Sequence, residues 1–251
     1  MTTRVVGVAC ALRSEARHLG PTVFADAAVH VLTDGTRVAV TGMGCAAARA
    51  GAQRLVKAGA GALVSFGMAG GLDPQLAAGR IFLPQKVASE GGRVLDCDPT
   101  WRERLGAALA VQAPLTLGTL LTSRGAVASV AAKAALFGGT GARAVDMESL
   151  AIAEVAHDAG LPFIALRVII DRAEDALPGA VLAATGADGE VSPGRLIVQL
   201  ARRPLQLASL LRLARAYHAA RRALAAVAAS GALALPPPAG SAAYPARREL
   251  P

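Results

Sequence analysis

Apolar residues along the chain gather in short runs that alternate with longer alanine-rich segments of helical length. Short apolar runs bounded by glycine, proline or polar residues are typical of buried strands, and apolar residues three or four positions apart are typical of helices. The pattern predicts strands over residues 4–11, 29–33, 37–41, 62–65, 80–88, 116–122, 144–145 and 162–170. It predicts helices over residues 14–19, 45–58, 99–111, 126–137, 149–159 and 193–203.

This alternation predicts an α/β protein with one domain, in which helices flank a mixed, twisted sheet. The chain has 251 residues, which is enough for one large domain with a substantial core. We expect this domain to occupy residues 1–203. Glycine-bearing turns are predicted at residues 41–44, 66–71 and 123–125, where they follow strands and could bring backbone amides close to a ligand.

A different pattern begins after residue 203. Pro204 should end the preceding helix. The next segment, residues 204–229, is predicted to be a basic amphipathic helix whose helical part spans residues 205–229. The residues expected on its apolar side are Leu207, Leu210, Leu211, Ala214, Tyr217 and His218. Arg212, Arg215 and Arg222 are expected on another side. Residues 230–251 are rich in proline, alanine and glycine and are predicted to be disordered.

The net charge of +8 lies in this C-terminal part of the chain. Residues 1–190 carry 17 basic and 17 acidic residues, whereas residues 191–251 carry nine arginines and a single acid, Glu249. A pI near 10.4 would suggest a protein that binds nucleic acid. The distribution instead indicates a neutral domain with a basic appendage, and we expect no nucleic-acid partner.

The three cysteines are widely spaced and form no CxxC pair. This argues against a disulfide framework and against a zinc site, and it fits a reducing compartment. The N-terminus shows no long apolar segment of the kind found in signal peptides. We therefore expect a cytoplasmic protein without a metal or a cofactor.

Two acids stand at the ends of buried elements. Glu148 lies in the tetrapeptide Asp146-Met147-Glu148-Ser149 at the start of a predicted helix, and Asp171 closes the predicted strand 162–170. In open α/β sheets, ligands bind just beyond the carboxyl ends of the strands. Carboxylates at that edge could hold sugar hydroxyls or give a proton to a leaving group.

The chain resembles the nucleoside phosphorylase/nucleosidase superfamily, and within it the methylthioadenosine/adenosylhomocysteine nucleosidases. Four segments resemble family motifs in the same order: GVACALRSEA at 7–16, TGMG at 41–44, GMAGGL at 67–72, and VDMES at 145–149 followed by RVIID at 167–171. The likeness covers residues 4–200. Its specificity lies in the order and spacing of the motifs together.

The resemblance implies that Asp171 protonates the departing purine and that Glu15 orients the attacking water or a sugar hydroxyl. It implies that Glu148 accepts hydrogen bonds from the ribose hydroxyls and that Met147 packs under the sugar. The other implied substrate contacts are Arg167, Val127, Ala128, Met68, Gly67 and Gly44. Breaking an N-glycosidic bond leaves charge on the base, which explains the need for acids.

The choice between water and phosphate as nucleophile stays open. Met68 stands where the family usually has serine or threonine, and Ser65 stands where phosphorylases carry arginine, which favours water. Arg13 lies where phosphorylases bind phosphate, so it is a candidate phosphate ligand and phosphate a candidate co-substrate. Val127 replaces an aromatic residue that stacks on adenine, and Ile170 replaces a serine.

The basic C-terminal helix makes the chain similar to the hopanoid-associated phosphorylases. This implies release of adenine from adenosylhopane, a homo-oligomer, and peripheral contact of the helix with the inner membrane face. One alternative is a nucleosidase for soluble methylthioadenosine or adenosylhomocysteine. The non-enzymatic alternative is a membrane-surface or nucleic-acid binding protein that acts through its arginines.

Overall fold

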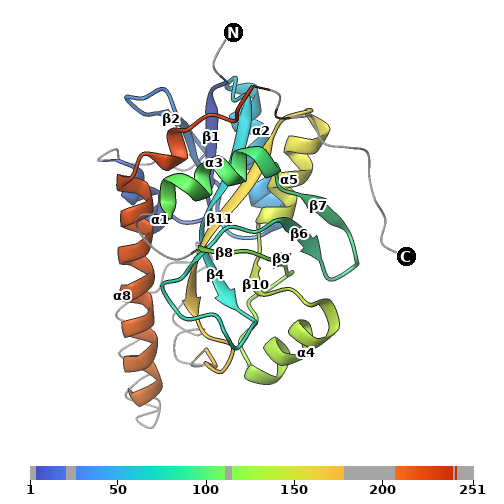
Figure 1. Cartoon of the computed structure of the whole chain (residues 1–251), viewed down its shortest axis with the longest axis vertical. Coiled ribbons are helices and arrows are strands. Elements are labelled where there is room, and N and C mark those ends of the chain that lie inside the picture. The colour runs from blue at the N-terminus through green and yellow to red at the C-terminus, as the bar shows by residue number, and fades with distance from the viewer. Residues whose placement is uncertain (1–3, 21–26, 111–114, 178–206, 240, 242–251) are drawn as a thin grey trace.

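A mixed sheet of eleven strands forms the centre of the part of the chain that the computed structural model describes, residues 4–20, 27–110, 115–177, 207–239 and 241 (Figure 1). The strands are β1 (Val6–Cys10), β2 (Val29–Val31), β3 (Arg37–Val40), β4 (Ala62–Gly71), β5 (Ile81–Phe82), β6 (Lys86–Ser89), β7 (Val94–Asp96), β8 (Leu115–Thr116), β9 (Thr119–Thr122), β10 (Ala144–Asp146) and β11 (Phe163–Asp171). The α-helices are α1 (Arg13–Ala16), α2 (Cys45–Lys57), α3 (Pro99–Leu109), α4 (Val130–Thr140), α5 (Ser149–Asp158) and α8 (Leu207–Ala229). Two 3₁₀ turns are η1 (Arg17–Leu19) and η3 (Ala232–Ala234).

Strand β4 is the central element of the sheet. It runs parallel to β1 on one side and to β11 on the other, and its last residues pair antiparallel with β10. The order β2-β3-β1-β4-β10-β9-β6-β7 follows from these pairings, and β11, β5 and β8 branch from β4. The carboxyl ends of β1, β10 and β11 therefore converge around the second half of β4.

An aliphatic core fills both faces of the sheet. Leu63, Phe66, Ile164 and Leu166 on β4 and β11 are fully buried. Helices α2 and α5 pack against each other on one side of the sheet, and α8 lies along β11 on another side (Figure 1). The predicted fold class, an α/β domain with a mixed sheet flanked by helices, is confirmed.

The predicted glycine turn at 66–71 is wrong, because this segment continues strand β4. Gly67, Met68 and Ala69 pair with β11, and Gly70 and Gly71 pair with β10. Two other predicted strands divide. The segment 80–88 becomes β5 and β6 on either side of Pro84, and 116–122 becomes β8 and β9 on either side of Gly118. Strand β7 was not predicted.

Helix α4 begins at Val130, four residues later than predicted, because the Ser129 side chain caps it by accepting a hydrogen bond from Ala132 N at 3.1 Å. It ends at Gly141, which has a φ of 66°. The predicted helix 14–19 consists of α1 followed by the tighter turn η1. The predicted helix 193–203 lies outside the described residues.

The predicted apolar side of α8 is also wrong in its described part. Leu211 is 53% exposed, whereas Ala220, Leu224 and Val227 are fully buried against the domain. The expected disorder after residue 229 does not apply to residues 230–239. Leu233 in η3 is buried, and the Trp101 indole donates to the carbonyl of Leu235 at 2.8 Å. The described part of the chain contains no helix that is both long and apolar enough to cross a bilayer.

Replacing Leu224 by alanine tests the docking of α8 on the domain. The change removes a fully buried side chain and should lower the free energy of unfolding by about 2–5 kcal/mol. Urea unfolding of the whole protein measures this loss. Leu211→Ala on the exposed side is the matched control and should change the value by less than about 0.5 kcal/mol. Equal effects of the two changes would show that α8 does not dock through Leu224.

Candidate functional site

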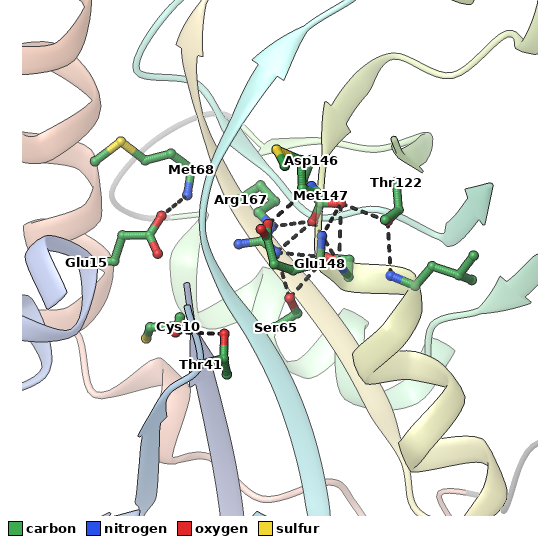
Figure 2. A network of polar contacts seen from close by, with 12 residues as sticks. Cys10, Glu15, Thr41, Ser65, Met68, Thr122, Asp146, Met147, Glu148 and Arg167 are labelled. Atoms are coloured by element: carbon green, nitrogen blue, oxygen red, sulfur yellow. Dashed lines mark hydrogen bonds and ion pairs between the residues drawn. The ribbon is translucent and has the colours of Figure 1, made fainter. Parts of the chain in front are cut away.

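Glu148 lies between β10 and α5, and its side chain turns toward the loop after β3 (Figure 2). Gly44 N donates to its Oε1 at 2.7 Å, and Met147 N donates to its Oε2 at 3.1 Å. Gly44 has a φ of 87°, a conformation that strains any residue with a Cβ. The structure thus brings the predicted residue Gly44 to Met147 and Glu148, although more than a hundred positions separate it from these two neighbours in the chain.

Arg167 and Asp146 form a buried ion pair behind Glu148 (Figure 2). The guanidinium donates to Asp146 Oδ2 from Nη2 at 2.7 Å and from Nε at 3.0 Å. Its Nη2 also lies 2.7 Å from Ser65 Oγ and 2.9 Å from Ser149 Oγ. Arg167 is only 1% exposed, so most of its donors serve the protein itself. Asp146 also accepts from Ser149 N at 3.1 Å, which fixes the start of α5.

Glu15 reaches from α1 to β4 and holds the backbone of the glycine-rich segment. Met68 N donates to its Oε1 at 2.8 Å, and Leu12 N donates to its Oε2 at 3.1 Å. A Cβ at Gly67 would lie 2.5 Å from Glu15 Oε1 and 2.6 Å from Arg167 Nη1. Gly67 is therefore required because the carboxylate of Glu15 and the free edge of the guanidinium approach the strand backbone from the same side.

Asp171 ends β11 and forms a buried ion pair with Lys133 of α4. Lys133 Nζ donates to Asp171 Oδ2 and to the carbonyl oxygens of Arg172 and Asp175 at 2.7 and 2.9 Å. The other oxygen, Oδ1, is buried and makes no hydrogen bond of normal geometry within the described residues. Lys133 was missed from the sequence, where its only signal is a cation inside an alanine-rich apolar helix.

Burial raises the pKa of Glu15, Glu148 and Asp171. It raises the pKa of Glu148 to about 7, with the Asp146 carboxylate as the second cause. Burial also raises the pKa of Glu15, although the Arg167 guanidinium acts in the opposite direction. The pKa of Asp171 is raised by burial and held back by Lys133. The site thus contains one carboxyl group, that of Glu148, which can exchange a proton near neutral pH.

The predicted base-binding segment lies between β9 and α4. Val127 and Ala128 are half-buried and line a pocket of about 470 Å³ together with Ser123, Glu90 and the side of α4. Glu15, Glu148 and Asp171 do not line this pocket. A backbone hydrogen bond connects this segment to the chain that follows the acid site. Leu177 N, six residues after Asp171, donates to the carbonyl of Ala128 at 2.9 Å.

The remaining predicted residues lie around the same edge of the sheet. Met68 and Met147 are half-buried, and Arg13 is exposed on α1, two residues before Glu15. Ser65 is fully buried and bonded to Arg167 and Ser149. The structure therefore brings the predicted acids, glycines and methionines together around the second half of β4 and leaves Arg13 at the surface.

The fold and the site together define a class: an α/β protein whose central strand is flanked by four buried acids, three of them near one arginine and the fourth paired with a lysine. Comparison with protein families is more specific. The sequence profile of the phosphorylase superfamily matches residues 26–193, so the chain belongs to that superfamily. This confirms the family expected from the motifs. A search of curated protein sequences found no match.

Solved structures of the same fold include several nucleosidases. The 5′-methylthioadenosine/S-adenosylhomocysteine nucleosidase of Helicobacter pylori is 16% identical, with a TM-score of 0.64 over 90% of this chain and 98% of that chain. The corresponding protein from Neisseria meningitidis is 19% identical, with a TM-score of 0.61 over 89% and 99%. Futalosine hydrolase of Helicobacter pylori is 18% identical, with a TM-score of 0.60 over 68% and 86%. At these identities the likeness establishes the fold.

Replacing Glu148 by glutamine should change how stability depends on pH. The folded-state pKa of about 7 lies above the unfolded value of about 4.3, so the folded state favours the protonated acid. Its contribution to stability is present below about pH 4.3 and is lost as pH rises through 7. Glu148→Gln, which stays neutral, should therefore gain stability relative to the unmodified protein between pH 5 and pH 8. Thermal unfolding at both pH values measures this. If the stability difference between Glu148→Gln and the unmodified protein is the same at both pH values, the raised pKa of Glu148 is contradicted.

Proposed function

We propose that this protein is a nucleosidase that hydrolyses the N-glycosidic bond of an adenine nucleoside with a 5′ substituent. The observation that carries the proposal is the placement of Glu15. Its carboxylate accepts a hydrogen bond from Met68 N and lies beside the Arg167 guanidinium. Membership of the phosphorylase superfamily and the fold shared with nucleosidases support the same reaction class.

Each acid has a distinct part in this reaction. The bond between the anomeric carbon and the base breaks, its electron pair moves to the base, and Asp171 donates a proton to the base nitrogen that receives the charge. Water adds to the sugar cation and gives its proton to Glu15. Glu148 accepts hydrogen bonds from the ribose hydroxyls. Proton transfer through solvent then restores Asp171 as the acid and Glu15 as the base.

Water suits this site better than phosphate. An incoming phosphate would need free backbone amides or exposed cations to hold its charge. The Met68 and Leu12 amides already donate to Glu15, and Arg167 is paired with Asp146. A second negative charge beside Glu15 would be repelled. Arg13, exposed on α1, is the remaining candidate to hold phosphate, and phosphate as a co-substrate is the less favoured form of the proposal.

The 5′ substituent is proposed from two separate considerations. The basic helix favours a lipid-linked nucleoside, for which adenosylhopane is the candidate, because the outward side of α8 carries Arg212, Arg215 and Arg222. The fold shared with methylthioadenosine/adenosylhomocysteine nucleosidases over 90% of the chain supports soluble nucleosides as the alternative. We also expect a homo-oligomer, which sedimentation can test.

A base-release assay tests the reaction. Purified protein is offered adenosylhopane, methylthioadenosine and adenosylhomocysteine, each with and without phosphate. We expect adenine and free sugar at a rate that phosphate does not change. Asp171→Asn should lower turnover on the order of a hundredfold or more, because a general acid is lost. No base release from any of these nucleosides would overturn the proposal, and strict dependence on phosphate would overturn the hydrolytic form of it.

Flotation with liposomes tests membrane contact through α8. Each arginine near an anionic surface contributes about 1 kcal/mol, and salt weakens the attraction. We expect binding to vesicles rich in phosphatidylserine at low salt, with loss of binding when Arg212, Arg215 and Arg222 are changed to glutamine. Neutral vesicles are the control. If anionic vesicles fail to bind the unmodified protein at low salt, α8 has only a packing role.

A further inference from the structure

Lys133 is a fully buried cation whose contacts all lie at the end of β11. It occupies the first turns of α4, next to the half-buried segment that contains Val127 and Ala128. An ammonium group has three N–H donors, and three acceptors surround it: Asp171 Oδ2 and the carbonyl oxygens of Arg172 and Asp175. The group is therefore satisfied and held in one orientation.

The two oxygens of Asp171 have different surroundings. Oδ2 accepts from Lys133, whereas Oδ1 is buried without a hydrogen bond of normal geometry within the described residues, and the nearby backbone N–H of Gly71 lowers the pKa of Asp171. A Cβ at Gly70 would lie 3.1 Å from Oδ1, so the absence of a side chain at Gly70 lets that oxygen approach β4 closely. The same Cβ would lie 3.3 Å from Val145 Cγ1, so Oδ1 lies close to β10 as well as to β4.

We propose that Lys133 is a positioning residue that makes Oδ1 of Asp171 the atom that carries the transferable proton. An ammonium N–H that already points at Oδ2 excludes a proton from that oxygen, so a protonated Asp171 must carry its hydrogen on Oδ1. Lys133 does not touch the substrate. It fixes the carboxyl plane and connects α4 and the segment after β11 to the acid. This inference rests on the proposed function for its catalytic part.

A purely structural lysine would have a different signature. Burying an ion pair is costly unless both groups are well hydrogen-bonded. A lysine that only holds α4 against β11 would therefore affect stability alone. A lysine that acts through Asp171 also affects the protonation of that acid, because a nearby cation favours the carboxylate. The charged groups that face Asp171 are Lys133 on α4 and Asp175 on the segment after β11, and they act in opposite directions.

The test compares Lys133→Met with Lys86→Met in the full-length protein. Lys86 is an exposed lysine on β6, 3.9 Å from Asp96, and serves as the matched control. Carbon-13 NMR of the side-chain carboxyls, with Asp171→Asn to assign the signal, follows the titration of Asp171 without any substrate. We expect Asp171 to titrate at higher pH in Lys133→Met, by one unit or more, and unchanged in Lys86→Met. An unchanged Asp171 titration in a folded Lys133→Met protein would overturn the inference.

Kinetics provide the second readout. The alkaline limb of kcat/KM should move to higher pH in Lys133→Met, and turnover should fall about ten- to a hundredfold. In the Asp171→Asn background the same change should lower turnover no further, because Lys133 acts through that acid. If Lys133→Met does not fold, Lys133→Gln removes the charge and keeps a donor, and the same shifts are expected. An inactive unmodified protein refutes the proposed function, whereas the NMR titration still decides the inference about Lys133.

Discussion

The buried guanidinium of Arg167 is the interaction on which the candidate site depends. A cation that is 1% exposed is tolerated only when it is paired and hydrogen-bonded, and Asp146 and two serine hydroxyls meet that need. Asp146 already balances the charge of Arg167. Glu15 and Glu148, which also lie in its field, therefore remain buried acids without a cation of their own. Burial raises the pKa of both acids, and Arg167, which is already paired with Asp146, offsets this only in part.

The same network connects electrostatics to architecture. Asp146 both pairs with Arg167 and accepts a hydrogen bond from Ser149 N in the first residue of α5, so the ion pair lies directly at the start of that helix. Gly67 lets Glu15 and Arg167 approach β4, and the pairing of β4 with β11 keeps Arg167 in register with Gly67. A side chain at position 67 would separate the two charged groups from the strand. Glu15 and Arg167 are thus held against the central strand, whereas Glu148 is held by the Gly44 amide of the loop after β3.

The sequence predicted those parts of the site that local patterns encode. The tetrapeptide that contains Asp146 and Glu148 indicated a helix start, and the apolar run before Asp171 indicated a strand end. The bond from Gly44 to Glu148 spans 104 positions, and no local pattern encodes it. Lys133 was missed because an isolated lysine in an alanine-rich helix is usually solvated. The buried side of α8 was predicted wrongly because the small residue Ala220 is fully buried, while the large apolar residue Leu211 is exposed.

The three acids belong to two electrostatic groups. Glu15 and Glu148 lie in the field of Arg167, and they influence each other because each is a buried carboxyl near the other. Asp171 has its own cation, Lys133, on a different helix. An acid and a base that work in one reaction must hold different protonation states at the same pH, which is easier when separate charges tune them. Lys133 gives Asp171 that independence, so in the proposed reaction the protonation of Asp171 can be set without disturbing Glu15 and Glu148.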